Sequence, residues 1–228
     1  MLVSTKNKQE IKTESLQAAA RVMQRCDALA LASLNPDHIE RTYLSTAHAQ
    51  ANKIVEGWIS EAQMDSWQDS VGNVWGRYTC KEKNAPALII GSHLDSVVNA
   101  GKYDGILGVL LGIELGNFLA RHQIDLPFHL DVVGFCDEEG VRFGATLLGS
   151  QALTGKWQPE WIELTDESGV SLAEAMIEFG LNPSKVKDAK RDPESIRGFL
   201  EVHIEQGPLL EKRGLPVGVV TDIAGARR

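Results

Sequence analysis

The stretch Ala87-Leu-Ile-Ile-Gly-Ser-His-Leu-Asp-Ser96 decides the fold. Its first four residues form an unbroken apolar run, which is typical of a strand that is covered on both faces of a sheet. His93 and Asp95 follow, and residues two apart point to the same face of an extended backbone. A carboxylate in that place can accept one imidazole N–H and leave the other ring nitrogen free for a metal ion. Because H-x-D alone is more often a capped turn with a core histidine, other parts of the chain have to decide between the two explanations.

The composition is that of a globular protein, with 228 residues, 43% of them hydrophobic and 24% charged. The net charge of −8 argues against nucleic acid or an anionic membrane as a partner. The three cysteines are widely separated and form no C-x-x-C pair, which favours a reducing compartment. The N-terminus has no apolar core of a signal peptide, and the longest apolar segment, 106–120, is interrupted by polar residues and glycines. We therefore expect a cytoplasmic protein that does not span a membrane.

The hydrophobic pattern alternates between helical and strand periods along the chain. Helical periodicity covers the following ranges: 9–33, 45–59, 105–121, 145–154 and 171–179. Strands are expected at these positions: 64–71 and 73–78 as a hairpin, then 86–93, 128–135, 199–204 and 217–223. The polar, proline-containing segment 181–195 is expected to be an exposed loop. This alternation predicts an α/β fold with a mixed, mostly parallel sheet and helices on both of its faces.

Polar clusters follow the predicted strands or lie in the loops after them. They are His93/Asp95, Asp104, Asp137-Glu138-Glu139 and His203-Ile204-Glu205-Gln206. Each cluster alone has an ordinary explanation, as solvated acids or as a core histidine. Together they supply the imidazole and carboxylate ligands that Zn²⁺ and Mn²⁺ prefer, and adjacent glutamates can divide metal binding and proton transfer between them. The chain has no G-x-S-x-G, no G-x-G-x-x-G after a strand and no phosphate-binding G-x-x-x-x-G-K-[ST] motif. The clusters therefore favour a divalent-metal site.

These motifs resemble a known family. Four of them, at 91–96, 103–105, 137–143 and 203–208, are similar in this order to the amidase/carbamoylase branch of the M20 metallopeptidase-like family. That branch contains allantoate amidohydrolases, N-carbamoyl-L-amino-acid hydrolases and β-ureidopropionases. The resemblance extends over about residues 16–228. The stretch 25–30 is most similar to the allantoate group, whereas the loop 96–108 is shared with the carbamoylases and does not discriminate.

The resemblance implies a truncated, zinc-exopeptidase-like catalytic domain with two divalent metal ions, zinc or manganese, with cobalt or nickel also possible. Asp104 would bridge the two ions. His93 and His203 would complete the first metal site. Glu139 would hold the second ion.

Three further roles follow from the motif positions. Glu138 would be the general base, Asp95 would orient His93, and Gln206 would contact the substrate. We expect residues 1–222 to be the N-terminal part of the catalytic domain and residues 223–228 to be a hinge towards a lid and dimerisation domain that this chain lacks. Members of the family also bind metal with one more histidine after that domain, and they are expected to be homodimers.

The function implied is metal-dependent hydrolysis of the ureido C–N bond of allantoate, a small-molecule substrate. The alternatives are hydrolysis of an N-carbamoyl-L-amino acid or a β-ureidopropionate, and an inactive metal-binding fragment. An aminoacylase or dipeptidase of the wider family is a further alternative, against which the residues 206–208 argue by resemblance.

Overall fold

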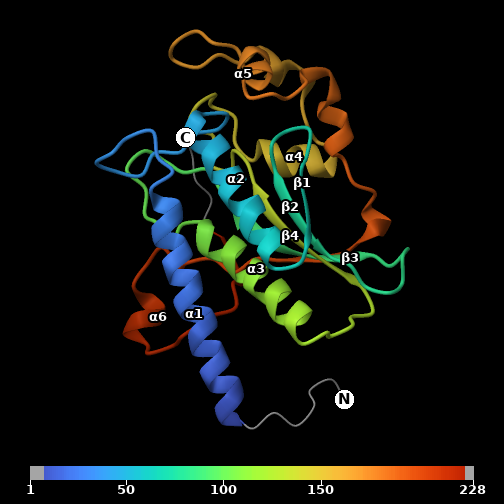
Figure 1. Ribbon diagram of the computed structural model, residues 1–228. Coiled ribbons are helices and arrows are strands. Elements are labelled where there is room, and N and C mark those ends of the chain that lie inside the picture. Colours follow the sequence, from blue (N-terminus) through green and yellow to red (C-terminus); the bar gives the residue numbers. More distant parts are fainter. Residues whose placement is uncertain (1–7, 224–228) are drawn as a thin grey trace.

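The computed structural model describes residues 8–223, which form a layered α/β arrangement around one sheet (Figure 1). The strands are β1 (Asp65–Gln68), β2 (Val74–Tyr78), β3 (Ala87–His93), β4 (His129–Phe135) and β5 (Ile196–Leu200). The helices are α1 (Lys8–Ala30), α2 (Thr46–Glu61), α3 (Ile106–Arg121), α4 (Leu148–Thr154), α5 (Leu172–Glu178) and α6 (Leu209–Lys212). Short 3-10 helices are η1 (Pro159–Glu163), η2 (Pro183–Ala189) and η3 (Pro193–Ser195).

The five strands lie in the order β1-β2-β4-β3-β5. β3 pairs in parallel with both β4 and β5, whereas the pairs β1–β2 and β2–β4 are antiparallel. The expected mixed α/β fold is therefore confirmed, with the parallel pairs gathered around β3. His93 lies opposite Phe135, so β3 and β4 end at the same level. The chain segments that follow these two strands consequently emerge together at one edge of the sheet.

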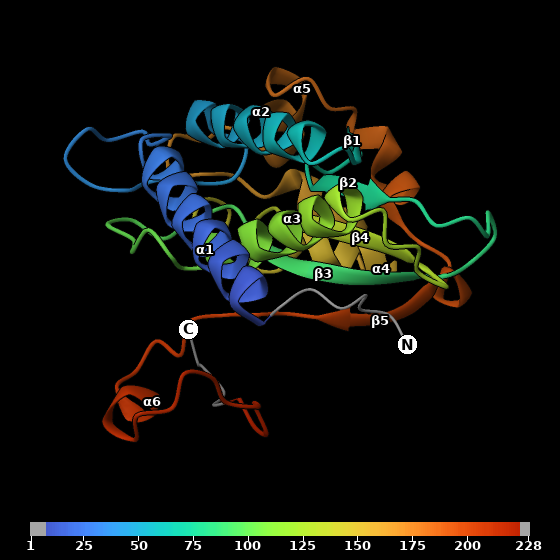
Figure 2. The same ribbon diagram turned by 60° about the horizontal axis from the view of Figure 1, so that its bottom comes forward.

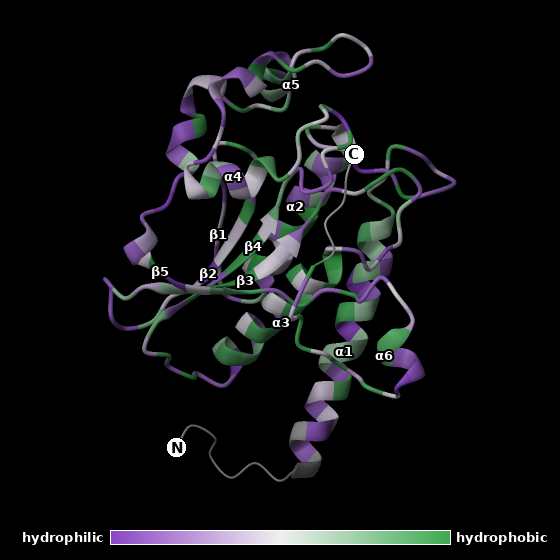
Figure 3. Ribbon diagram, turned by 180° about the vertical axis from the view of Figure 1, so that it is seen from behind, coloured by the Kyte–Doolittle hydropathy of each residue, from purple (hydrophilic) through white to green (hydrophobic). Residues whose placement is uncertain are grey.

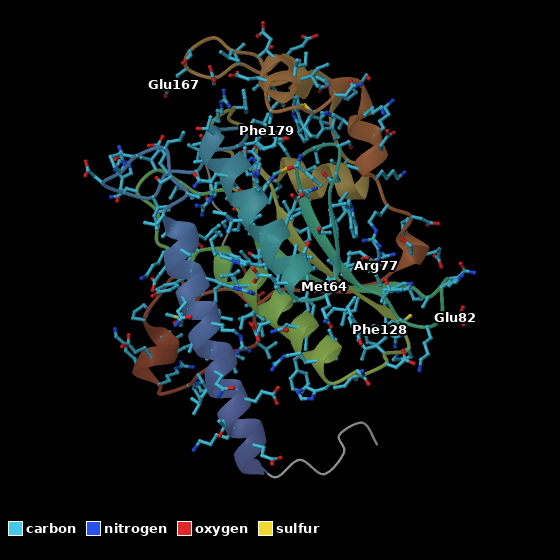
Figure 4. All side chains as sticks on the ribbon, viewed as in Figure 1. Met64, Arg77, Glu82, Phe128, Glu167 and Phe179 are labelled. Atoms are coloured by element: carbon cyan, nitrogen blue, oxygen red, sulfur yellow. The ribbon has the colours of Figure 1, made fainter. Side chains whose placement is uncertain are left out.

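Helices cover both faces of the sheet. Figure 2 shows α1, α2 and α3 on one side. On β3, Ile90 packs with Leu119 of α3, whereas the adjacent Ile89 packs with Leu153 of α4 on the opposite face. This alternation explains why the strand is apolar without interruption. Met64, labelled in Figure 4, fills the space above Gly116 of α3, where no side chain would fit.

The segment after β5 differs from the rest of the described chain. Its first residues return to the end of β3, whereas α6 lies apart from the packed layers (Figure 2). Figure 3 shows hydrophobic residues on α6 in green, and Leu209 there is 51% exposed. The predicted strand 217–223 is wrong, because these residues form no ladder and Val219 is 95% exposed. A β-prone run with no neighbouring strand has no partner for its backbone groups.

Two other predictions need correction. The strand predicted at 199–204 is β5, which ends at Leu200, so His203 follows the strand instead of belonging to it. The segment 181–195 is not merely an exposed loop, because η2 and η3 begin at its prolines and η2 buries Val186 and Ala189. The predicted hinge is 223–228, and its residues 224–228 lie outside the described part of the chain. No helix between residues 8 and 223 is long and apolar enough to cross a membrane.

Candidate metal centre

His93 is the last residue of β3 and is only 4% exposed. Its Nδ1 lies 3.0 Å from the main-chain carbonyl oxygen of Asp95, which fixes the plane of the ring. Its ring packs against Gly105, where an added Cβ would lie 2.5 Å from Cδ2 and Nε2. Gly105 also has a φ of +71°, which side-chain-bearing residues rarely adopt. Position 105 therefore requires glycine for two reasons, and the ring of His93 lies against the loop that carries Asp104.

Asp95 connects the ends of β3 and β4. It is 2% exposed, and its two carboxylate oxygens accept the main-chain N–H groups of Glu138 and Glu139, each at 3.0 Å. Burial raises the pKa of Asp95, while His93 and these amides act in the opposite direction. The carboxylate lies 3.7 Å from Nδ1 of His93, so the expected orienting contact is made by the main-chain oxygen of Asp95 instead. The carboxylate itself positions the two glutamates.

The predicted ligands form two groups that share His93. One group is His93, Asp104 and His203, and the other is His93, Glu138 and Glu139; in each, one ligand atom per residue lies within 4.8 Å of the others. The rings of His93 and His203 are stacked with their centroids 5.8 Å apart. Nε2 of His203 lies 3.2 Å from Asp104. The structure thus brings the ends of β3, β4 and the segment after β5 to one place.

The charges in this place fit a divalent cation. Burial raises the pKa of Glu139, and the negative charges of Glu138, Asp95 and Asp104 raise it further, whereas His93 acts in the opposite direction. Carboxylates that repel one another beside two imidazoles are stabilised by a cation between them. Imidazole and carboxylate together are ligands for Zn²⁺ or Mn²⁺.

The remaining predicted residue, Gln206, lies at the open side of the site. Its side-chain amide donates to both oxygens of Asp104, at 2.9 and 3.0 Å. The residue expected to contact substrate therefore contacts the carboxylate expected to bridge the ions. The segment that carries Gln206 and His203 is tied back to β3, because Ser92 donates to Glu201 at 2.5 Å.

Sequence reasoning assigned no role to Asp137, although it belongs to the acidic cluster. Its φ is +50°, it is 1% exposed, and neither carboxylate oxygen has a hydrogen-bond partner among the described residues. Burial raises its pKa well above the ordinary value, and the charges of Asp95 and Glu138 add to this. Arg41 has no sequence signal either, because an isolated arginine before a helix belongs to no motif.

Comparison with known proteins shows the family of this chain. The model of peptidase family M28 matches residues 73–180. Allantoate deiminase of Arabidopsis thaliana is 44% identical over 198 residues, which are 84% of this chain and 37% of that protein. N-carbamoyl-L-amino acid amidohydrolase of Geobacillus stearothermophilus is 41% identical over 82% of this chain and 46% of its own length. This chain belongs to the amidase/carbamoylase family over the part that it spans.

Solved structures of this M20/M28-like family have the same fold. The crystal structure of AtUAH in complex with (S)-hydroxyglycine superposes with a TM-score of 0.80 at 33% identity, covering 86% of this chain and 48% of that one. A hydantoinase/carbamoylase family amidase from Burkholderia ambifaria gives a TM-score of 0.77 at 29% identity, over 86% of this chain and 47% of its own. The amidase/carbamoylase chain described here therefore spans less than half the length of these relatives.

Proposed function

We propose that this chain is the N-terminal part of the catalytic domain of a binuclear metal-dependent amidohydrolase that cleaves the ureido C–N bond of allantoate. The observation that carries the proposal is the pair of ligand groups that share His93. Two neighbouring groups of imidazole and carboxylate ligands are an arrangement that can hold two ions side by side. Metal ions bound there would supply an activated water and polarise the carbonyl oxygen of the substrate.

We assign the ligands as the resemblance implies. Asp104 bridges the ions, His93 and His203 complete one site, and Glu139 holds the second ion. This assignment is supported by Nε2 of His203 lying 3.2 Å from Asp104 and by ligand atoms of His93, Asp104 and His203 lying within 4.8 Å of one another. Gln206, which donates to Asp104, exchanges that bond for a contact with the substrate.

Glu138 is then the general base. It accepts a proton from the attacking water and returns it to the departing nitrogen, which leaves as ammonia. Its main-chain N–H is held by Asp95, so the position of the base depends on a buried contact. The contacts of Asp95 therefore hold the two glutamates and His93 in fixed positions relative to one another.

Allantoate is the leading substrate because the relative with 44% identity is an allantoate deiminase. N-carbamoyl-L-amino acids are the second candidate, since another relative at 41% identity is an N-carbamoyl-L-amino acid amidohydrolase. The test uses a complete version that carries a C-terminal half like that of the relatives, and measures ammonia release from both substrates side by side. We expect a higher kcat/KM for allantoate, and a clear preference for an N-carbamoyl amino acid would overturn the substrate assignment.

The chain of 228 residues is itself expected to be inactive and to hold at most one ion tightly. His93, Asp104 and His203 give one ion three protein ligands, a complete catalytic-type zinc site with water. The second ion keeps only Glu139 and the shared Asp104, which form a weak site for Zn²⁺. Elemental analysis after dialysis against metal-free buffer counts the bound ions. Two tightly bound ions per chain, or turnover near that of the complete version, would show that the site is completed in another way.

A further inference from the structure

Arg41 is a buried arginine beside the metal centre, with only 2% of the residue exposed. Its guanidinium donates to three main-chain carbonyls: Nε to Leu94 at 2.6 Å, and the same terminal nitrogen to Leu29 at 3.0 Å and to Ala32 at 2.7 Å. None of these partners is a carboxylate. The planar guanidinium therefore links the C-terminal end of α1 to the chain that follows β3.

The carbonyl of Leu94 belongs to the residue between His93 and Asp95. Leu94 is fully buried, and its N–H donates to the carbonyl of Phe135 at the end of β4, at 2.9 Å. The Leu94 peptide unit is thus held from both sides, by β4 and by Arg41. The main chain of Arg41 also exchanges two bonds with Ser96: its N–H donates to Oγ at 2.9 Å, and its carbonyl accepts the Ser96 N–H at 3.0 Å.

The cost of burying this charge indicates a role beyond filling space. Burial lowers the pKa of Arg41 to about 10, so the side chain remains protonated at neutral pH. The charge of Asp95 acts on this pKa in the opposite direction, but no ion pair of Arg41 is found among residues 8–223, and a buried charge of this kind is unfavourable unless its hydrogen bonds are well satisfied. One of its three side-chain bonds holds the Leu94 carbonyl in the turn that places Asp95, the other two attach it to the end of α1, and an apolar residue could make none of them.

We propose that Arg41 is a positioning residue for the metal centre, which acts by fixing the Leu94 peptide and with it His93 and Asp95. Displacement of this turn would move the ring of His93 and would also shift the amides of residues 138–139, which Asp95 holds. The inference rests on the proposed metal-binding function of this site. It adds that the affinity for metal depends on a residue that touches no ligand atom.

The experiment compares Arg41→Lys and Arg41→Gln with the unmodified chain, using Co²⁺ as the probe. Lysine keeps the charge but has one nitrogen, which cannot serve Leu94 and the end of α1 together as the guanidinium does. Co²⁺ affinity and the visible absorption spectrum of the bound ion are measured on samples shown to be folded by circular dichroism. Arg191→Lys is the matched control, because Arg191 is a partly buried arginine bound to Asp131 on the sheet, away from the metal ligands.

We expect both Arg41 variants to bind Co²⁺ about 10- to 100-fold more weakly, with a changed spectrum, as is typical when the support of a ligand is removed. Arg191→Lys is expected to lower thermal stability and to leave affinity and spectrum unchanged. If the Arg41 variants do not fold, Ser96→Ala replaces them. This change removes the bond from the main-chain N–H of Arg41 to Ser96 Oγ. It is expected to weaken Co²⁺ binding several-fold, and unchanged binding would overturn the proposal. Affinity of Arg41→Lys within twofold of the unmodified chain, with the same spectrum, would also overturn it. Absence of Co²⁺ binding by the unmodified chain would overturn the proposed metal site itself.

Discussion

Asp131→Asn is expected to destabilise the sheet strongly. Asp131 lies on β4 and is fully buried, and its carboxylate accepts three bonds from two arginines. Arg77, labelled in Figure 4, donates Nε at 2.7 Å and a terminal nitrogen at 2.8 Å, and Arg191 donates at 2.7 Å. Arg191 follows η2, so this carboxylate anchors the segment 181–195 to the sheet.

The magnitude follows from burial on the two sides of the contact. Removing one partner of a buried ion pair typically costs about 3–5 kcal/mol, because the other partner is left uncompensated. The side chains of Arg77 and Arg191 are 30% and 18% exposed, so water recovers part of that loss. We therefore expect Asp131→Asn to lower the free energy of unfolding by about 3 kcal/mol, the lower end of that range. For a chain of this size that corresponds to a fall of about 6–12 °C in Tm.

Thermal unfolding followed by circular dichroism measures the change. The control is Asp125→Asn, which removes an ion pair to Lys81 whose side chains are 41% and 86% exposed and which should give no resolvable shift. A double variant with Arg191→Gln tests the pairing directly. If Arg191→Gln costs the same with and without Asp131, or if Asp131→Asn shifts Tm no more than the control, the anchoring contact does not exist as described.

Three further changes test the site and the core. Glu138→Gln in a complete version is expected to lower kcat by about two to four orders of magnitude. The variant should keep its metal, because the neighbouring Glu139 is the assigned ligand. Loss of metal in elemental analysis would exchange the roles of general base and metal ligand between the two glutamates. Gly105→Ala is expected to abolish Zn²⁺ binding in calorimetry, since its Cβ would lie 2.5 Å from the ring of His93, whereas Gly101→Ala, with no atom within 4 Å, should bind normally. Burial, together with a nearby arginine charge, lowers the pKa of His48 to about 3, so below pH 6.5 the unfolded chain takes up a proton that the folded chain does not. The free energy of unfolding should therefore fall by about 2 kcal/mol from this group between pH 7 and pH 5, and denaturant titration of His48→Gln should show that this part of the fall is gone.

The sequence predicts best where one pattern determines the structure. β3 and β4 are buried along almost their whole length because both of their faces are covered, and polar clusters follow them directly. The clusters at 93–95 and 137–139 could therefore be placed from the strand ends, whereas the roles of single residues came from the family resemblance. The segment 217–223 is also rich in β-branched residues, but it has no neighbouring strand, and composition does not reveal whether a pairing partner exists.

Other features depend on single residues that no periodicity marks. Val186 and Ala189 become buried because η2 starts at Pro183, although the segment around them is polar. The main-chain contacts of Asp95 and Arg41 escape sequence reasoning for a similar reason. Motifs identify which residue types meet, but hydrogen bonds to main-chain groups depend on the course of the backbone.

The two ligand groups differ in how firmly the fold holds them. His93, Glu138 and Glu139 are attached to the ends of packed strands and are linked through Asp95. His203 comes from a segment beyond β5 that is largely exposed, and its side chain retains 30% of its accessible surface. An ion bound between His93 and His203 therefore joins a rigid ligand to a loosely packed one. Part of the binding free energy must be spent on ordering that segment, so metal binding should also stabilise the chain between β5 and α6.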